Sequence, residues 1–229
     1  MIRYAKLSLP FDAELTQSEL LTIKEEWQPH FNVSYYEGSW TGLPLRTPDG
    51  KHDTIIPDLM GQAEYQDTTY MPYFPSVIKM LSGLNCPVMS VRFLNLQAGA
   101  VIKKHTDKGL FFEQGEARLH FPVFTNPDVE FYVDGERVIM SLGECWYMNA
   151  HLPHSVANNG TTDRIHLVVD CVVNDWLRSI FKSPDAISVK KEDKGREHLM
   201  IIQQLRRQNT ITSNKLADDM EQQLKESDE

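Results

Sequence analysis

A histidine and an aspartate stand two residues apart at His105 and Asp107, where a segment that alternates like a β-strand ends. On a strand, residues i and i+2 point to the same side, so both side chains can reach one ion. In a chain with eight histidines, one such pair arises often by chance. The pair predicts a metal site only if further ligands come to the same place.

A third ligand candidate lies in the segment 153–170, "PHSVANNGTTDRIHLVVD", which we interpret as a β-hairpin with a polar tip at residues 158–162. This register makes His154 and Arg164 cross-strand neighbours on one face. The outgoing strand then has an apolar face and a polar one, and the polar face carries Arg164, His166 and Asp170. Because buried charge needs a partner, the polar face indicates a binding cavity.

The segment 117–124, "ARLHFPVF", repeats this alternation, since Arg118 and His120 face one way and Leu119 and Phe121 the other. Three strands thus present histidine, aspartate and arginine side chains to one cavity. Two histidines and one carboxylate that leave coordination positions open are the ligand set of non-haem Fe(II) oxygenases. Arginine recognises carboxylates through paired hydrogen bonds. The pattern predicts a metal beside a small dianion.

Composition limits the class of protein. The chain of 229 residues has a net charge of -9, which disfavours nucleic acid and anionic membranes as partners. Its three cysteines lack CxxC spacing, so neither a disulfide framework nor a thiolate zinc site is expected. The first residues have no apolar leader, and no apolar run of membrane-spanning length occurs. We expect a cytoplasmic protein.

The order of elements predicts the architecture. Short β-rich runs with turn signals fill residues 88–171, which is typical of an antiparallel sandwich or jelly roll. One helix is expected near 16–27, with Thr16 as its N-cap, and a second one at 75–81. Residues 1–173 should form the main domain and 174–229 a helical segment. The helices of that segment would cover the sheet or form a homodimer.

The motifs "HTD", "ARLHFP", "GECWYMN", "PHSVANN" and "DRIHLVVD", preceded by "SVRFLNLQAGAVIKKH", together resemble the aspartyl/asparaginyl β-hydroxylase family of 2-oxoglutarate- and Fe(II)-dependent dioxygenases. Within the family the chain looks most like the bacterial proline hydroxylases. The resemblance covers about residues 30–172. It implies a mainly β fold with helices, a cupin-like jelly roll called a double-stranded β-helix.

The resemblance also implies a function and roles for single residues. Enzymes of this family use Fe(II), 2-oxoglutarate and O2, and they hydroxylate an unactivated C–H bond while releasing succinate and CO2. Here the substrate would be a free, proline-like amino acid or an Asp/Asn-type side chain. The implied iron ligands are His105, Asp107 and His154, and the implied partners of the co-substrate are Arg164, Arg118, His120 and His166.

Substrate residues are harder to assign. The candidates that could bind an amino-acid carboxylate or pack conventionally are Arg92, Trp40, Arg46, Tyr35 and Tyr36. His30, His52 and His198 are interpreted as surface residues.

Two other functional classes have to be considered. A cupin-type metal-binding protein that isomerises, hydrolyses or merely binds a small ligand could use the same metal ligands. The two arginines Arg118 and Arg164 favour the oxygenase, because that alternative does not need a dianion clamp. The tail segment "IIQQLRRQNTITSNKLADDM" looks like part of a helix-turn-helix, but its acidic end is unsuited to DNA phosphates.

Overall fold

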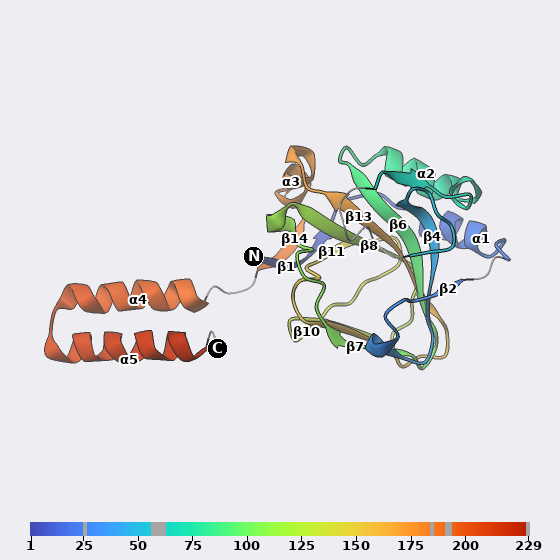
Figure 1. Cartoon of the computed structure of the whole chain (residues 1–229). Helices are drawn as coiled ribbons and strands as arrows, with labels where there is room; N and C mark the ends of the chain where they lie inside the picture. The colour runs from blue at the N-terminus through green and yellow to red at the C-terminus, as the bar shows by residue number, and fades with distance from the viewer. Residues whose placement is uncertain (25–26, 56–62, 184–185, 191–193, 228–229) are drawn as a thin grey trace. The chain divides into compact units, whose positions relative to one another are not determined.

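The computed structural model describes residues 1–24, 27–55, 63–183, 186–190 and 194–227. The chain forms two compact units, Met1–Lys190 and Lys191–Glu229. No helix among the described residues is long and apolar enough to cross a membrane. The first unit contains both sheets and is described first (Figure 1).

The larger sheet has nine strands, and all of its pairings are antiparallel. Across the sheet the order is β14 (Ile187–Lys190), β1 (Ile2–Leu7), β11 (Cys145–Met148), β8 (Glu116–Phe124), β13 (Arg164–Val172), β6 (Val88–Leu96), β4 (Trp40–Pro48) and β2 (Gln28–Pro29), with β5 (Tyr65–Asp67) paired to β4.

The smaller sheet has five antiparallel strands, in the order β10 (Glu136–Arg137), β9 (Val129–Val133), β12 (His154–Asn158), β7 (Val101–His105) and β3 (Tyr36–Glu37). It faces the larger sheet, and apolar side chains from both sheets form one core cluster between them. The mainly β architecture confirms the predicted jelly-roll fold.

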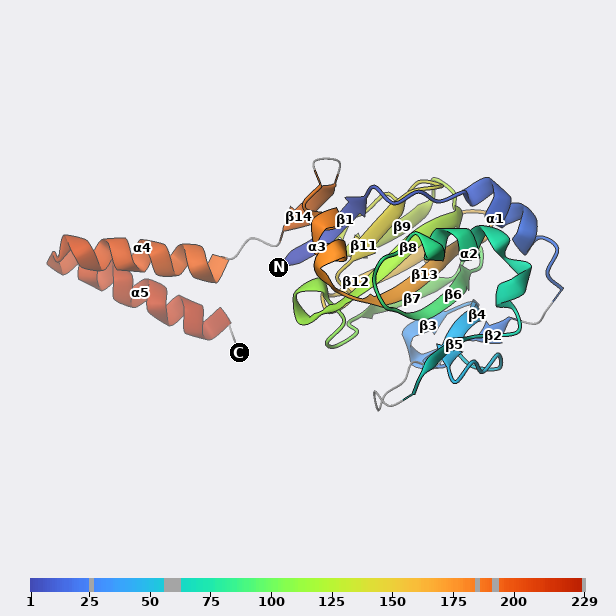
Figure 2. The ribbon, with the colours of Figure 1, turned by 90° about the horizontal axis from the view of Figure 1, so that it is seen from above.

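Helices cover the outer face of the larger sheet (Figure 2). They are α1 (Ala13–Leu20), α2 (Pro75–Ser82) and α3 (Asp175–Phe181). The described residues also form three short 3-10 helices, which are η1 (Val33–Tyr35), η2 (Met71–Tyr73) and η3 (Phe112–Gln114). Strand β13 shows how the sequence separates the two faces. Leu167 and Val169 pack in the core beneath the helices, whereas Arg164 and Asp170 line a cavity between the sheets. The predicted alternation of this strand is confirmed.

The helix starts show where local signals succeed and fail. Helix α2 begins at Pro75 and ends before Gly83, as predicted. Helix α1 begins earlier than predicted, because Asp12 is its N-cap and accepts from the Leu15 backbone N–H at 3.0 Å. Thr16 lies inside the helix, where its hydroxyl contacts Ser76 at 2.8 Å. The predicted start at Thr16 is therefore wrong by about one helical turn.

The predicted hairpin between β12 and β13 is wrong. Strand β12 pairs with β7 and β9 in the smaller sheet, and β13 pairs with β6 and β8 in the larger one. Residues 159–163 therefore cross between sheets instead of turning back. Asn158 is fully buried at the start of this crossing, and its Nδ2 donates to the carbonyls of Leu96 at 3.0 Å and Thr162 at 2.9 Å. These bonds provide hydrogen-bond partners inside a polar stretch whose sequence resembles a turn.

The first unit continues beyond residue 173, where the sequence placed the end of the main domain. Leu177 and Phe181 of α3 belong to the core, and β14 pairs with β1. The second unit is a helical pair, α4 (Lys194–Gln208) and α5 (Ile211–Ser227). Within it, Arg206 on α4 pairs with Asp218 on α5 at 2.6 Å. Homodimer formation through these helices stays a prediction.

Candidate active site

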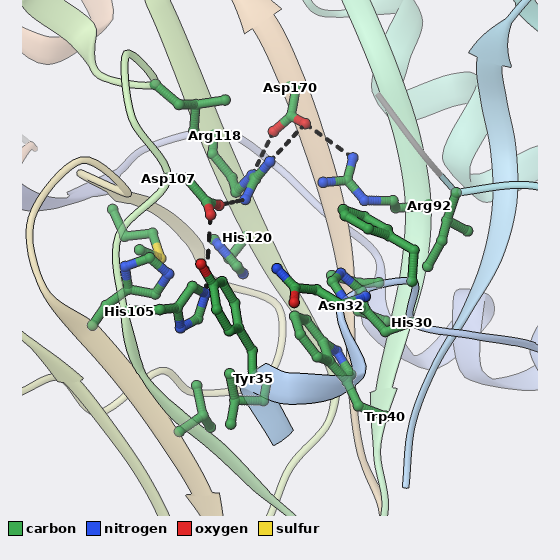
Figure 3. A pocket seen from close by; sticks show the side chains of 18 of the residues that line it. His30, Asn32, Tyr35, Trp40, Arg92, His105, Asp107, Arg118, His120 and Asp170 are labelled. Carbon is green, nitrogen blue, oxygen red and sulfur yellow. Dashed lines mark hydrogen bonds and ion pairs between the residues drawn. The ribbon is translucent and has the colours of Figure 1, made fainter. Parts of the chain in front are cut away.

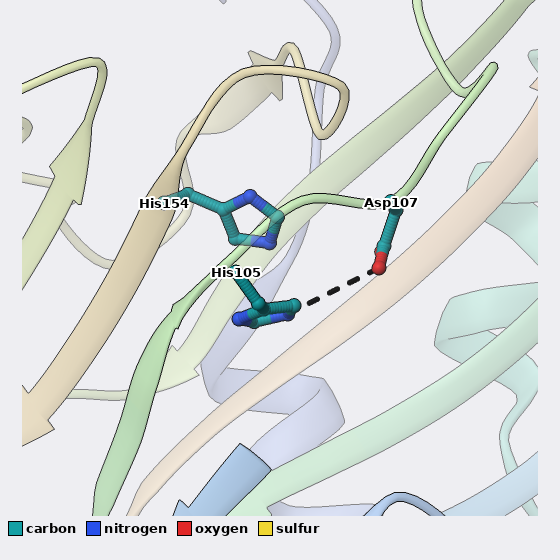
Figure 4. A group of neighbouring side chains, drawn as sticks. All are labelled: His105, Asp107 and His154. Carbon is teal, nitrogen blue, oxygen red and sulfur yellow. Dashed lines mark ion pairs between the residues drawn. The ribbon is translucent and has the colours of Figure 1, made fainter.

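Three ligand candidates meet at one end of the smaller sheet. His105 ends β7 and His154 begins β12, and the two are paired across these neighbouring strands. Asp107 follows two residues later, with its backbone N–H held by the carbonyl of Ala150 at 2.8 Å. Each of the three side chains has one possible metal-ligating atom, and these atoms all lie within 4.8 Å of one another (Figure 4). The structure thus brings together the three residues that the sequence singled out.

The backbone fixes which nitrogen of each histidine is available. Nδ1 of His105 donates to the carbonyl of Lys103 at 2.7 Å, and Nδ1 of His154 donates to that of Leu152 at 2.9 Å. Each ring therefore keeps the lone pair of Nε2 for a ligand. Burial and the neighbouring His105 lower the pKa of His154 to about 4, so its imidazole is neutral near pH 7.

Arg118 orients the carboxylate of the group. Oδ2 of Asp107 accepts from Arg118 Nη1 at 2.7 Å, and Oδ1 lies 4.0 Å from Nε2 of His105. Burial opposes the charged form, but Arg118 and the two histidines outweigh it and hold the pKa of Asp107 below its usual value. One oxygen is thus occupied by arginine, and the other faces the histidines.

Asp170 connects two arginines behind this carboxylate. Its oxygens accept from Nε and Nη2 of Arg118 at 2.7 and 3.1 Å, from Nη1 of Arg92 at 2.9 Å, and from the Ser90 hydroxyl at 2.8 Å. Asp170 is 4% exposed, and the attraction of both arginines outweighs burial and keeps its pKa far below the usual range. The cluster holds both guanidinium groups in place (Figure 3).

Arg164 is a different kind of cation. It is 2% exposed, and no carboxylate among the described residues pairs with it. Its Nη2 donates to Nδ1 of His166 at 2.8 Å, its guanidinium lies 5.5 Å from the centre of the Phe131 ring, and its Nε has no partner in the described structure. Burial lowers the pKa of Arg164 to about 9. A buried cation without a counter-ion fits an anionic ligand.

These groups line one cavity of about 640 Å³ between the sheets. His120 also lines it, is 5% exposed, and has both ring nitrogens without a partner in the described structure. His166 is placed behind Arg164, at the wall of a smaller cavity of about 190 Å³. The strands therefore bring the expected histidines and arginines together, with His166 in a supporting position.

The substrate candidates divide. Arg92 and Trp40 line the cavity. Arg46 does not, because its guanidinium pairs with Asp67 at 2.6 Å and with the carbonyl of Tyr65 at 3.0 Å. Its position on β4 opposite Asp67 explains this arrangement.

Part of the cavity wall could not be predicted from the sequence. His30, expected on the surface, stacks on Trp40 with ring centres 3.5 Å apart and lines the cavity with Asn32, which was not singled out; the candidate Tyr35 lines it as well. The segment around it has neither helical nor strand periodicity, so no local signal identified its inward face. His198 lies where the structure describes no side chain.

The family model for aspartyl/asparaginyl beta-hydroxylase matches residues 12–173, which is more than half of the chain. The chain belongs to this family. The match by an aspartyl/asparaginyl beta-hydroxylase model extends from the N-cap of α1 to the end of β13, and so includes all three ligand candidates.

The individual proteins that match this aspartyl/asparaginyl beta-hydroxylase family member share low sequence identity with it. The chain is 27% identical over 179 residues to L-proline cis-4-hydroxylase of Rhizobium meliloti (strain 1021), and the match covers 76% of this chain and 62% of that protein. The chain thus spans less than two thirds of that relative's length.

Two solved structures are also similar. A 2OG-Fe(II) oxygenase family oxidoreductase from Burkholderia pseudomallei has a TM-score of 0.47 at 12% identity, covering 69% of this chain and 78% of its own. A Pseudomonas putida prolyl-4-hydroxylase has a TM-score of 0.45 at 15% identity, covering 76% and 94%.

Proposed function

We propose that the protein is an Fe(II)- and 2-oxoglutarate-dependent dioxygenase. It hydroxylates an unactivated C–H bond of a free, proline-like amino acid or of an Asp/Asn-type side chain, and it releases succinate and CO2. The observation that carries this proposal is the group of His105, Asp107 and His154, with donor atoms within 4.8 Å, in the same cavity as the unpaired cation Arg164.

The ligand set fits Fe(II). Two imidazole Nε2 atoms and one oxygen of Asp107 would hold the ion with three ligands, a set that leaves coordination positions open for other molecules. Bound iron would supply the activation of O2, coupled to decarboxylation of 2-oxoglutarate, that oxidises the C–H bond. The protein's own contribution is to keep both histidines in the ligating tautomer and to aim Asp107 through Arg118.

Arg164 fits the distal carboxylate of 2-oxoglutarate. Its buried guanidinium has an unpartnered Nε, and only Nη2 is used within the described structure, by His166. Since Nδ1 of His166 accepts this bond, the His166 ring is neutral and adds no charge of its own. A carboxylate here would gain a charge-assisted pair in a nearly dry site, worth about 1.5–3 kcal/mol.

For Arg118 we propose an orienting role beside the co-substrate contact that the resemblance implied. Three of its N–H groups are used by Asp107 and Asp170, which makes it an orienting residue for the metal ligand. We also assign a co-substrate contact to His120, whose ring nitrogens have no partner in the described structure.

The charge of the cavity indicates a substrate with one carboxylate. Three arginines and a divalent metal face two aspartates and the dianionic co-substrate, which leaves one positive charge over. Lys108 and Glu116, which also line the cavity, offset each other. The surplus lies at Arg92 and Arg118, which share Asp170. Arg92 is therefore the residue for the carboxylate of the substrate.

The test is turnover under defined conditions. Protein purified without oxygen, then loaded with Fe(II) and 2-oxoglutarate, is offered L-amino acids and short peptides, and products are screened by mass spectrometry for a gain of one oxygen. Succinate release should require both O2 and 2-oxoglutarate. Substrate conversion without either would favour the cupin-type isomerase or hydrolase, and no succinate under any condition would refute the oxygenase.

A further inference from the structure

The segment His30–Tyr35 forms a wall of the cavity beside the metal ligands. At one end, the ring of Tyr35 lies against His105 with centres 4.9 Å apart. At the other end, His30 stacks almost parallel to Trp40, at 3.5 Å and 11°. These contacts fix the wall both to the metal-ligand group and to strand β4 (Figure 3). Side chains between the two ends are therefore close to any substrate that reaches the metal.

His30 is a neutral hydrogen-bond donor in this wall. The backbone N–H of Asn32 donates to its Nδ1 at 3.4 Å, so the ring proton is on Nε2. No described residue accepts a hydrogen bond from Nε2. Burial, followed by repulsion from Arg92 and Arg118, lowers the pKa of His30 to about 3, and the ring stays uncharged at physiological pH. Its N–H is available to a ligand.

Asn32 provides a second uncharged donor. The Ser34 hydroxyl donates to its Oδ1 at 3.0 Å, and this bond turns the amide nitrogen toward the centre of the cavity (Figure 3). No described residue accepts from Nδ2. Two neighbouring N–H groups of the wall, on His30 and Asn32, therefore lack an acceptor within the described structure, and neither carries a full charge.

We infer that His30 and Asn32 together bind an uncharged carbonyl oxygen of the substrate, separate from the carboxylate held at Arg92. The inference rests on the proposed function. Both wall groups are uncharged donors, which suit a neutral oxygen, whereas a carboxylate is held more strongly by an arginine. An amino group does not fit, because both wall groups are donors. The substrate class is an amino acid or short peptide that has a carboxamide or peptide carbonyl in addition to its carboxylate.

The test compares ligands of similar shape. L-asparagine and L-leucine differ mainly in the carboxamide, and L-proline has no second carbonyl. Binding is measured by thermal shift with Ni(II) in place of Fe(II), so that it needs no turnover, and KM is measured with Fe(II). The variants are His30→Phe, which keeps the stack on Trp40, His30→Gln, which keeps an N–H, and Asn32→Leu. His52→Phe, at an exposed histidine outside the cavity, is the matched control.

We expect L-asparagine to bind better than L-leucine or L-proline. His30→Phe and Asn32→Leu should each raise its KM about 5- to 10-fold, the usual range for one lost neutral hydrogen bond. The KM for 2-oxoglutarate and kcat should change less than about twofold, and His30→Gln should restore part of the loss. Equal binding of L-asparagine and L-leucine, or an unchanged KM in His30→Phe, overturns the inference. Carboxamide binding without any succinate release would refute the proposed function alone.

Discussion

Arg118 donates to Asp107 at 2.7 Å through Nη1 while its Nε and Nη2 bind Asp170. A single planar guanidinium thus connects the only carboxylate of the ligand group to a buried aspartate on the larger sheet. The orientation of the Asp107 side chain is thus determined by a planar guanidinium of fixed geometry, which the point charge of a lysine cannot reproduce.

Arg118→Lys should therefore weaken metal binding by about 10-fold, the lower end of the effect of losing an orienting partner. Titration of the apoprotein with Co(II), followed by absorption, measures this directly. Arg178→Lys, on α3 away from the cavity, is the control. Unchanged affinity in Arg118→Lys would show that Asp107 needs no orientation.

Removing the carboxylate itself should have a larger effect. Asp107→Ala leaves two neutral imidazoles for a divalent cation, so Fe(II) affinity should fall by at least about 10-fold and turnover should be lost. Metal content after dialysis against a weak chelator distinguishes the variant from wild type. Normal iron content and normal turnover would exclude the proposed ligand set.

Arg164→Met should separate stability from co-substrate binding. Replacing a buried unpaired cation by an apolar side chain of similar length is often neutral or stabilising, so the melting temperature of the free protein should not fall. The KM for 2-oxoglutarate should rise by about 10-fold or more, because the charge-assisted pair is worth roughly 1.5–3 kcal/mol. A variant that is much less stable yet keeps the wild-type KM contradicts this role.

Asp170→Asn should destabilise the fold. The substitution leaves Arg92 and Arg118 buried without their shared anion, a situation that costs about 3–5 kcal/mol. Urea denaturation gives the free energy of unfolding. Asp67→Asn removes the exposed partner of Arg46 and should cost at most about 1 kcal/mol. Similar values for both variants would mean that the buried cluster adds no stability.

Acid should destabilise the metal-free protein through its buried histidines. His30 and His154 have folded pKa values of about 3 and about 4, below the usual value of about 6.5. The unfolded chain therefore binds more protons between about pH 6.5 and pH 4, and the free energy of unfolding falls as pH is lowered through that window. The loss should be about 2 kcal/mol per histidine at pH 5. The free energy of unfolding, measured by urea titration at pH 7.5 and pH 5, should fall less in His30→Phe than in the wild type. An equal fall in both proteins would contradict the low pKa assigned to His30.

Strand alternation was enough to predict much of the site. In β8 and β13, apolar and polar residues alternate over most of each strand, so Arg118, His120, Arg164 and Asp170 could be placed on the cavity side from sequence alone. The pair of His105 and Asp107 was predicted from the same geometry, although β7 ends at His105 and Asp107 follows it. These predictions succeeded because the period of a strand is a local property.

The parts that failed depend on long-range packing. The polar stretch after Asn158 has the composition of a hairpin turn, but β12 and β13 pair in different sheets. The Asn158 side chain stabilises the crossing through its bonds to Leu96 and Thr162. His30 lies in an irregular segment, where nothing local states which side faces inward. Its position depends on Trp40, ten residues further along the chain.

The crossing after β12 also bears on the choice of keto acid. His154 stands at the start of β12 and Arg164 at the start of β13, so one short stretch of backbone, held at Asn158, separates the proposed metal ligand from the proposed carboxylate partner. Under the proposed function, the span between these two residues determines how long a diacid can reach both. Discrimination between 2-oxoglutarate and its shorter or longer homologues would then be a property of main-chain length, and redesign of the substrate wall would leave it intact.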